Sequence, residues 1–270
     1  MRKLSDDEIK KISVLMLKDI KQVCNKLKLT YFLDSGSLLG AIRHNGFIPW
    51  DDDIDVAMPR PDYEVFIKQY NKYCTDRYKI KTLENSLSYI YPWAKVYDKT
   101  TKLYEHGNNY CNLGLSIDIF PIDAYPDSDN EKKAHWESIT QVFSDYASEE
   151  YYFFNHYSAN PRYLKKNFHI FLSKNGLFRK KAKLVVQVAK SINWNNASNA
   201  GVNVCCYYRN RARYVSKECF TPIEHIFEGE MFTIPKGYDS ILKSYYGDDY
   251  MIPPPIEKRT SSHSLEIFQK

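Results

Sequence analysis

FIPWDDDIDVAMPR, residues 47–60, places four aspartates within five positions and then continues as an apolar run. Charges packed this tightly repel one another, and carboxylates seldom stand beside a buried segment without a partner. If the segment is a strand, alternate side chains share a face, so Asp51, Asp53 and Asp55 point one way while the apolar residues point into the core. Three carboxylates on one face require a cation to offset their mutual repulsion.

A second aspartate-bearing strand is predicted for LSIDIFPID, residues 115–123. Its apolar residues alternate onto one face and leave Asp118 on the other, where a neighbouring strand would add it to the first three aspartates. Carboxylate oxygens are hard ligands that favour Mg²⁺ or Mn²⁺ over zinc. A carboxylate cluster spread over two strands suits a two-metal phosphoryl-transfer centre, with ions held by Asp51, Asp53, Asp55 and Asp118.

The residues DSGS, 34–37, predict the end of a strand, a tight turn and the start of a short helix. Gly36 lets the backbone turn sharply, and Ser37 places a hydroxyl at a helix N-terminus, where amides and the helix dipole attract phosphate. Arg43 follows in the same helix and is positioned to hold a phosphate oxygen with two hydrogen bonds; a surface arginine is the alternative. A Gly-Ser turn is weak evidence alone and becomes stronger ahead of the DxD run.

A calcium loop and a solvated turn account less well for the acidic run. An EF-hand calcium loop counted from Asp51 requires glycine at position 56 and glutamate at position 62, where the chain has Val56 and Asp62. A solvated acidic turn does not account for the apolar alternation that follows. The sequence has no GxSxG, P-loop or GxGxxG motif that would indicate a nucleophilic triad or another phosphate site.

The remaining pattern predicts an α/β (α+β) protein. Ser5 and Glu8 form a capping box before an amphipathic helix over 6–28, and Pro61 opens another helix. Strands are predicted over 77–83, 89–98 and 113–122, and the pattern turns helical from 131 to about 191. We therefore expect three parts: a catalytic core over 1–130, a helical insertion over 131–215, and a C-terminal segment over 216–270 that packs back on the core.

The net charge of +5 is unevenly distributed along the chain. Residues 151–217, the basic window, contain thirteen lysines and arginines and no acidic residue, so they carry +13 and the rest of the chain carries −8. Aromatic residues are interleaved with these cations, which fits a surface that meets anionic lipid headgroups. Nucleic acid is not expected as a partner, because no recognition motif accompanies the charge.

The termini, the hydropathy and the cysteines indicate where the protein works. The N-terminus is charged from its first residues and lacks an apolar signal-peptide core, and no apolar stretch approaches the length of a membrane span. The six cysteines show neither a CxxC pair nor a zinc-like spacing with histidine. We therefore expect a cytoplasmic protein with reduced thiols, peripherally associated with the inner face of the cell membrane.

The Gly-Ser turn, the DxD run and the later carboxylate together resemble the nucleotidyltransferase superfamily, whose mixed-sheet core is a polymerase-β-like palm. Residues 34–66 are similar to the signature of the LicD family, relatives of the fukutin-type transferases. Further similarities lie in WAKVYDKTT, residues 93–101, in IDIFPID, residues 117–123, and in the closing segment 227–263. The predicted insertion over 131–215 carries little that the resemblance covers.

The resemblance implies a phosphocholine transferase that uses CDP-choline, releases CMP and acts on a sugar hydroxyl of an anionic, lipid-linked glycan precursor of teichoic acid or lipopolysaccharide. Asp118 would take the proton from the hydroxyl, and Lys95 would either reach the donor diphosphate or form a salt bridge to an aspartate. The implied metal ligands and donor-phosphate residues coincide with those that strand alternation and the Gly-Ser turn indicate: Asp51, Asp53, Asp55, Asp118, Gly36 and Ser37.

Several alternatives stay open for the sequence alone. The donor alcohol could be ribitol, as in eukaryotic relatives, or glycerol; an NTP-dependent nucleotidyltransferase and a non-catalytic binding protein would share the same residues. Asp52 is expected on the opposite face, where it would only cap or support the turn, and Trp50 is expected to pack rather than to stack on a base. Asp123 and His263 belong to matching motifs, but no chemical role is favoured for them.

Overall fold

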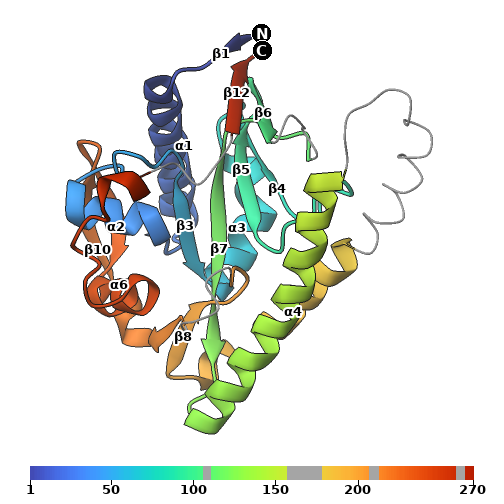
Figure 1. The fold of residues 1–270 in the computed structure, drawn as a ribbon, viewed down its shortest axis with the longest axis vertical. Coiled ribbons are helices and arrows are strands. Elements are labelled where there is room, and N and C mark those ends of the chain that lie inside the picture. Colours follow the sequence, from blue (N-terminus) through green and yellow to red (C-terminus); the bar gives the residue numbers. More distant parts are fainter. Residues whose placement is uncertain (106–110, 157–177, 207–212, 260–264) are drawn as a thin grey trace.

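The computed structural model describes residues 1–105, 111–156, 178–206, 213–259 and 265–270 (Figure 1). Within these residues a seven-stranded mixed sheet forms the centre, in the order β2-β3-β7-β5-β4, with β8 and β9 continuing from β7. β3 and β7 run parallel, and the other neighbours run antiparallel. The strand bounds are β2 Phe32–Leu33, β3 Asp55–Pro59, β4 Tyr78–Lys81, β5 Ala94–Asp98, β7 Ser116–Tyr125, β8 Asn199–Val202 and β9 Tyr214–Ser216.

β7 organises the sheet because it is long enough to pair with β5 through its first half and with β8 through its second. Its side chains alternate between two hydrophobic cores: Ile117 and Ile119 belong to the first, and Phe120 and Ile122 belong to the second. Each face of the sheet is therefore buried, as expected for a strand whose side chains are mostly apolar.

The first core is covered by three N-terminal helices: α1 Asp6–Leu27, α2 Ser35–His44 and α3 Arg60–Tyr73. The predicted capping box of α1 is confirmed, since Ser5 Oγ accepts from the Glu8 amide and the Glu8 carboxylate accepts from the Ser5 amide. The helix then buries Met16, Leu17 and Ile20 at helical spacing. Pro61 lies in the first turn of α3, where its missing N–H costs nothing.

The second core is covered by α4 Asp129–His156 and by a helix over 178–189. In Figure 1, α4 crosses in front of the sheet, and α3 lies behind it. Ile139 and Phe143 from α4 pack with Val185 and Ala189 from the second helix in this core. Both helices fall in the region that was predicted to be helical.

The C-terminal part packs on the first core. A hairpin of β10 Pro222–Phe227 and β11 Glu230–Pro235 is followed by α6 Tyr238–Tyr246, and both contribute buried residues such as Phe232 and Ile241. Two ion pairs between α1 and the hairpin, Lys18–Glu230 at 2.8 Å and Lys21–Glu224 at 3.1 Å, link their exposed edges. Short 3₁₀ turns lie at η2 Trp194–Asn196, η3 Lys217–Phe220 and η4 Ile256–Lys258.

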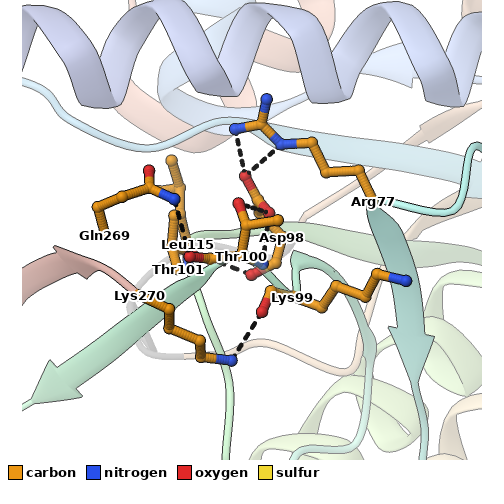
Figure 2. Close-up of polar contacts among 8 residues, drawn as sticks. All are labelled: Arg77, Asp98, Lys99, Thr100, Thr101, Leu115, Gln269 and Lys270. Carbon is orange, nitrogen blue, oxygen red and sulfur yellow. Dashed lines mark hydrogen bonds and ion pairs between the residues drawn. The ribbon is translucent and has the colours of Figure 1, made fainter. Parts of the chain in front are cut away.

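The two termini meet in a small sheet of β1 Arg2–Lys3, β12 Leu265–Gln269 and β6 Thr101–Glu105 (Figure 1). Figure 2 shows how the turn between β5 and β6 is fixed there. The fully buried carboxylate of Asp98 accepts from the Arg77 guanidinium at 2.8 Å and from the Thr100 amide at 2.8 Å. Gln269 then donates to the Thr100 carbonyl at 3.0 Å, which ties the C-terminal strand to this turn.

The predicted mixed α/β class is confirmed, whereas the likeness to a polymerase-β-like palm and the three-part division of the chain stay predictions.

One strand prediction is wrong at its start. β3 begins only at Asp55, and residues 51–54 form a loop that follows a turn closed by the Asp51 amide on the Ile48 carbonyl at 2.9 Å. A strand would hold alternate carboxylates of this stretch on one face, where they would repel one another. The stretch therefore forms a loop.

Candidate active site

The aspartates of the two motifs meet where β3 and β7 begin. Asp55 and Asp118 are direct partners in the parallel pair, so their side chains leave the sheet on the same face. The Asp118 amide donates to the Ile54 carbonyl at 3.3 Å, which fixes the register. The structure therefore brings Asp118 to Asp55, as the alternation of LSIDIFPID predicted.

Three more carboxylates lie in the loop that precedes β3. Carboxylate oxygens of Asp51, Asp52 and Asp53 all lie within 4.8 Å of one another, and all three residues are half-buried. The expectation that Asp52 points to the opposite face is wrong, because strict alternation applies to a strand and these residues are in a loop. We call Asp51, Asp52, Asp53, Asp55 and Asp118 the acid cluster.

The acid cluster has an excess of negative charge. Burial raises the pKa of Asp55 well above its usual value, and the neighbouring charges of Asp53 and Asp118 raise it further. Oxygen donors at this spacing suit a hard divalent cation such as Mg²⁺ or Mn²⁺. The donor set therefore fits the metal centre predicted from the sequence; the assignment of individual ligands stays a prediction.

The first turn of α2 contacts the acid cluster directly. A Cβ on Gly36 would lie 2.5 Å from Asp51 Oδ2, so a larger residue here would displace this carboxylate from the helix N-terminus, where the helix dipole favours negative charge. The buried Ser37 hydroxyl accepts from the Asp55 amide at 2.9 Å and thereby fixes α2 against β3. This positioning role was not predicted, and the role of both residues at donor phosphates stays a prediction.

Asp118 is held by two donors. Lys95 is its register partner on β5, and the Lys95 ammonium contacts Asp118 Oδ1. Trp93 Nε1 donates to Asp118 Oδ2 at 2.9 Å. The structure thus shows the salt bridge that was one of two roles expected for Lys95; contact with the donor diphosphate stays a prediction.

Arg43 lies in the last turn of α2, and its guanidinium makes structural contacts, one of them from Nε to His44 Nδ1 at 3.4 Å. Arg43 Nη1 donates to the Tyr250 carbonyl at 2.8 Å, and Arg259 Nε donates to the Pro254 carbonyl at 2.8 Å. The Arg259 guanidinium also lies 5.1 Å from the centre of the Trp50 ring, which packs against the first core as expected. Two arginines therefore hold the segment over 250–254, and the phosphate role of Arg43 stays a prediction.

The sequence did not predict a buried polar group behind the acid cluster. The Asp34 amide donates to the Asp55 carbonyl at 3.0 Å, and burial raises the pKa of the Asp34 carboxyl while the nearby Arg213 lowers it. Tyr245 hydrogen-bonds to Asp34, and the Arg213 guanidinium lies 4.5 Å from the centre of the Tyr245 ring. Arg213 is only 7% exposed and was counted among the surface cations of the basic window. The feature of the sequence that could have indicated this buried group is Asp34 itself, the first residue of DSGS.

Asp123 has a structural role. Its carboxylate accepts two hydrogen bonds from Arg60 at the start of α3, from Nε at 2.6 Å and from Nη2 at 2.7 Å, and both side chains are largely buried. This pair joins α3 to β7, the strand that also carries Asp118. His263 lies outside the described residues.

The basic window does not form one uniform cationic surface. This corrects the expectation, drawn from its charge alone, that its cations together form a surface for anionic headgroups. Among its described cations, Arg179 donates to the carbonyls of Leu83, Ser86 and Tyr89, and Lys217 donates to the Trp194 carbonyl at 2.6 Å. The lysines that are exposed lie on or just after the helix over 178–189: Lys180, Lys183 and Lys190. Six other cations of the window fall outside the described residues: Arg162, Lys165, Lys166, Lys174, Arg209 and Arg211.

The chain is similar to known proteins. Residues 28–157, which contain the acid cluster, match the family model described as LicD/FKTN/FKRP, nucleotidyltransferase domain. The chain is 30% identical over 276 residues to the lipopolysaccharide cholinephosphotransferase LicD of Haemophilus influenzae, and the match covers 99% of each chain. It is 36% identical over 75 residues to an uncharacterized protein of Rickettsia prowazekii, which covers 24% of this chain and 28% of that protein.

These matches define a transferase. More particularly, the chain belongs to the LicD family. Among the residues that the structure describes, no helix has both the length and the apolar character needed to cross a bilayer.

Proposed function

We propose that this protein transfers phosphocholine from CDP-choline to a sugar hydroxyl of a cell-surface glycan precursor and releases CMP. The observation that carries the proposal is the acid cluster, in which parallel pairing sets Asp55 beside Asp118 and the preceding loop adds further carboxylates. The relative that matches the whole chain supports the choline phosphate donor and a lipopolysaccharide acceptor by its name. A teichoic acid precursor would present the same kind of hydroxyl.

The acid cluster would hold two ions of Mg²⁺ or Mn²⁺. The ligands that we propose are Asp51, Asp53, Asp55 and Asp118, with Asp52 close by. When bound, such ions supply positive charge that offsets the diphosphate and lowers the pKa of the attacking hydroxyl. The first turn of α2, with Gly36 and Ser37, would lie at the donor phosphates because a helix N-terminus favours anions.

The reaction is an in-line displacement at the phosphorus that carries choline. The hydroxyl oxygen of the acceptor forms a bond to phosphorus, the bond from phosphorus to the CMP oxygen breaks, and the hydroxyl proton passes to a carboxylate, for which we propose Asp118. Lys95 and Trp93 fix the orientation of Asp118, and its oxygens keep further lone pairs for the proton. Positioning and charge supply most of the rate enhancement, as is general for phosphoryl transfer.

The donor is tested by incubating the protein and Mg²⁺ with CDP-choline, CDP-ribitol, CDP-glycerol and labelled nucleoside triphosphates, each with and without acceptor. We expect CMP to be released from CDP-choline fastest. Release of pyrophosphate from a triphosphate would instead identify a nucleotidyltransferase, and binding without turnover would identify a non-catalytic protein. If CDP-ribitol or CDP-glycerol is preferred, the proposed type of reaction stands, but the alcohol of the donor is not choline.

We further propose that the protein works in the cytoplasm at the inner face of the membrane, on a lipid-linked acceptor. The exposed lysines Lys180, Lys183 and Lys190 support this, because a surface of like charge attracts anionic headgroups.

A further inference from the structure

A row of aromatic rings ends at the acid cluster. Tyr89, Tyr91 and Trp93 lie in the segment before β5, with ring centres 5.5 Å apart for Tyr89 and Tyr91 and 5.4 Å apart for Tyr91 and Trp93. Trp93 then donates from Nε1 to Asp118 Oδ2 at 2.9 Å. The aromatic row is thus in direct contact with the carboxylate that we propose as the proton acceptor.

A cation already lies over these rings. Lys95 Nζ is 4.8 Å from the centre of the Tyr91 ring and 5.9 Å from the centre of the Trp93 ring, while it also contacts Asp118. The rings are largely shielded from water, since Tyr91 is 9% and Trp93 is 4% exposed. Aromatic faces attract cations more strongly when both are desolvated, and quaternary ammonium groups are a ligand class that such rings recognise.

We propose, on the basis of the proposed function, that Tyr91 and Trp93 form the subsite for the trimethylammonium group of the donor's choline, and that the Lys95 ammonium leaves the rings for a phosphate oxygen when the donor binds. Choline nitrogen is joined to the phosphate ester oxygen through two methylene groups. A phosphate held at the edge of the acid cluster beside Asp118 therefore brings the nitrogen toward the place that Lys95 occupies.

The exchange of the two cations is chemically favourable. A primary ammonium donates charge-assisted hydrogen bonds, which a phosphate oxygen accepts well. A trimethylammonium group has no N–H to donate, so an aromatic face suits it better than a phosphate or a carboxylate lone pair. The same arrangement explains why a lysine on β5 lies between the aromatic row and the acid cluster.

The first test needs no variant. The wild-type protein with Mg²⁺ is given CDP-choline or its neutral isostere, the CDP ester of 3,3-dimethylbutanol, in which a carbon replaces the nitrogen. We expect a preference for CDP-choline of about 2- to 30-fold in kcat/KM, which corresponds to a desolvated cation on aromatic rings. Equal use of both donors overturns the subsite. Failure to release CMP from any CDP-alcohol overturns the proposed function itself, and the two failures are therefore distinct.

The second test locates the preference. Tyr91→Leu should reduce it to nearly equal use of the two donors, whereas Tyr91→Phe, which keeps the ring, should retain it. The matched control is Tyr97→Leu on β5, because Lys81 Nζ lies 5.4 Å from the Tyr97 ring centre and Tyr97 pairs with Ser116 rather than Asp118. A folded Tyr91→Leu variant that keeps the full preference, or a Tyr97→Leu variant that loses it equally, overturns the assignment.

Discussion

Asp55 shows how the acid cluster concentrates negative charge. Its pKa is raised by burial first and then by the charges of Asp53, Asp118, Asp34 and Asp51, so every neighbour named acts in the same direction. Keeping this carboxylate charged costs free energy unless a cation offsets the repulsion. Structural ion pairs in the same molecule, such as Arg60 with Asp123, are built with their counter-charge in place. In the acid cluster, Lys95 pairs with Asp118, and the divalent ions that we propose would offset the remaining charge.

Replacing Asp53 or Asp55 by asparagine should abolish transfer while the fold is retained. We expect activity to fall by more than about 100-fold, since even residues that only orient metal ligands cost about 10- to 100-fold. Without divalent ions the melting temperature should hold or rise, because a repulsive charge has been removed. Activity with CDP-choline and thermal melting in excess chelator measure the two effects.

Asp76→Asn is the control for that pair of variants, because Asp76 is exposed and lies in the turn before β4, away from the acid cluster in sequence. It should change neither property. Metal-dependent transfer that survives in both Asp53→Asn and Asp55→Asn would contradict the assignment of these ligands.

At the level of elements, α3 is attached to β7 by a buried ion pair. Arg60 opens the helix, and its guanidinium forms two parallel hydrogen bonds with Asp123 near the end of the strand. The pair fixes the helix that follows β3 directly, and β3 carries Asp55. The position of α3 therefore matters for the geometry of the acid cluster even though neither residue of the pair belongs to it.

Asp123→Ala should destabilise the protein by about 3–5 kcal/mol, because it removes the buried carboxylate that pairs with Arg60 and leaves this guanidinium, among the described carboxylates, only the longer contact with Glu64 at 3.5 Å. The melting temperature should fall by roughly 6–20 °C for a chain of this size. The double variant Arg60→Met, Asp123→Leu should recover most of the loss, since it removes both charges. Asp129→Ala is the matched control: its carboxylate also pairs with a cation, Lys132 at 3.1 Å, but is 97% exposed. A loss in the control as large as in Asp123→Ala would argue against a special role for burial.

The sequence predicted most of what depends on alternation and capping, and it failed where contacts join distant segments. The α1 capping box and the meeting of Asp118 with Asp55 follow from local pattern. The loop at Asp51–Asp53 was predicted as strand, because alternation with Ile54 and Val56 masked the turn at Ile48. The burial of Arg213 next to Asp34 has no local signature, since it depends on β9 and α6 packing on the sheet.

Across the whole molecule, metal and donor should stabilise the native state together. CMP or CDP-choline at about 100 times its Kd should add about 2.7 kcal/mol in the presence of Mg²⁺ or Mn²⁺ by mass action, which raises the melting temperature by about 5–11 °C. In excess chelator the acid cluster would repel the donor phosphates, and the shift should vanish. Thermal melting with each ligand measures this, and an equal shift in chelator would mean that the acid cluster does not hold the donor through metal ions.

The distribution of charge leads to a prediction about membranes. Lys180, Lys183 and Lys190 are exposed cations of the basic window, and each lysine near an anionic surface adds roughly 1 kcal/mol of binding. Reversing all three to glutamate should therefore weaken binding to anionic vesicles by about 100-fold or more at low salt. Binding by the wild type should itself fall steeply with added salt, because screening limits the attraction to about 10 Å at roughly 0.1 M.

The matched control reverses Lys11, Lys68 and Lys236, which are also exposed but lie on α1, on α3 and after β11. It changes the net charge equally, so an equal loss of vesicle binding would mean that net charge alone is responsible. The window variant should keep its hydrolysis of CDP-choline and its transfer to a short soluble glycan, because the acid cluster is untouched. Transfer to a lipid-linked acceptor should fall with vesicle binding. If activity on soluble and lipid-linked acceptors is lost alike, these lysines belong to the active site, and a membrane-binding role for them is excluded.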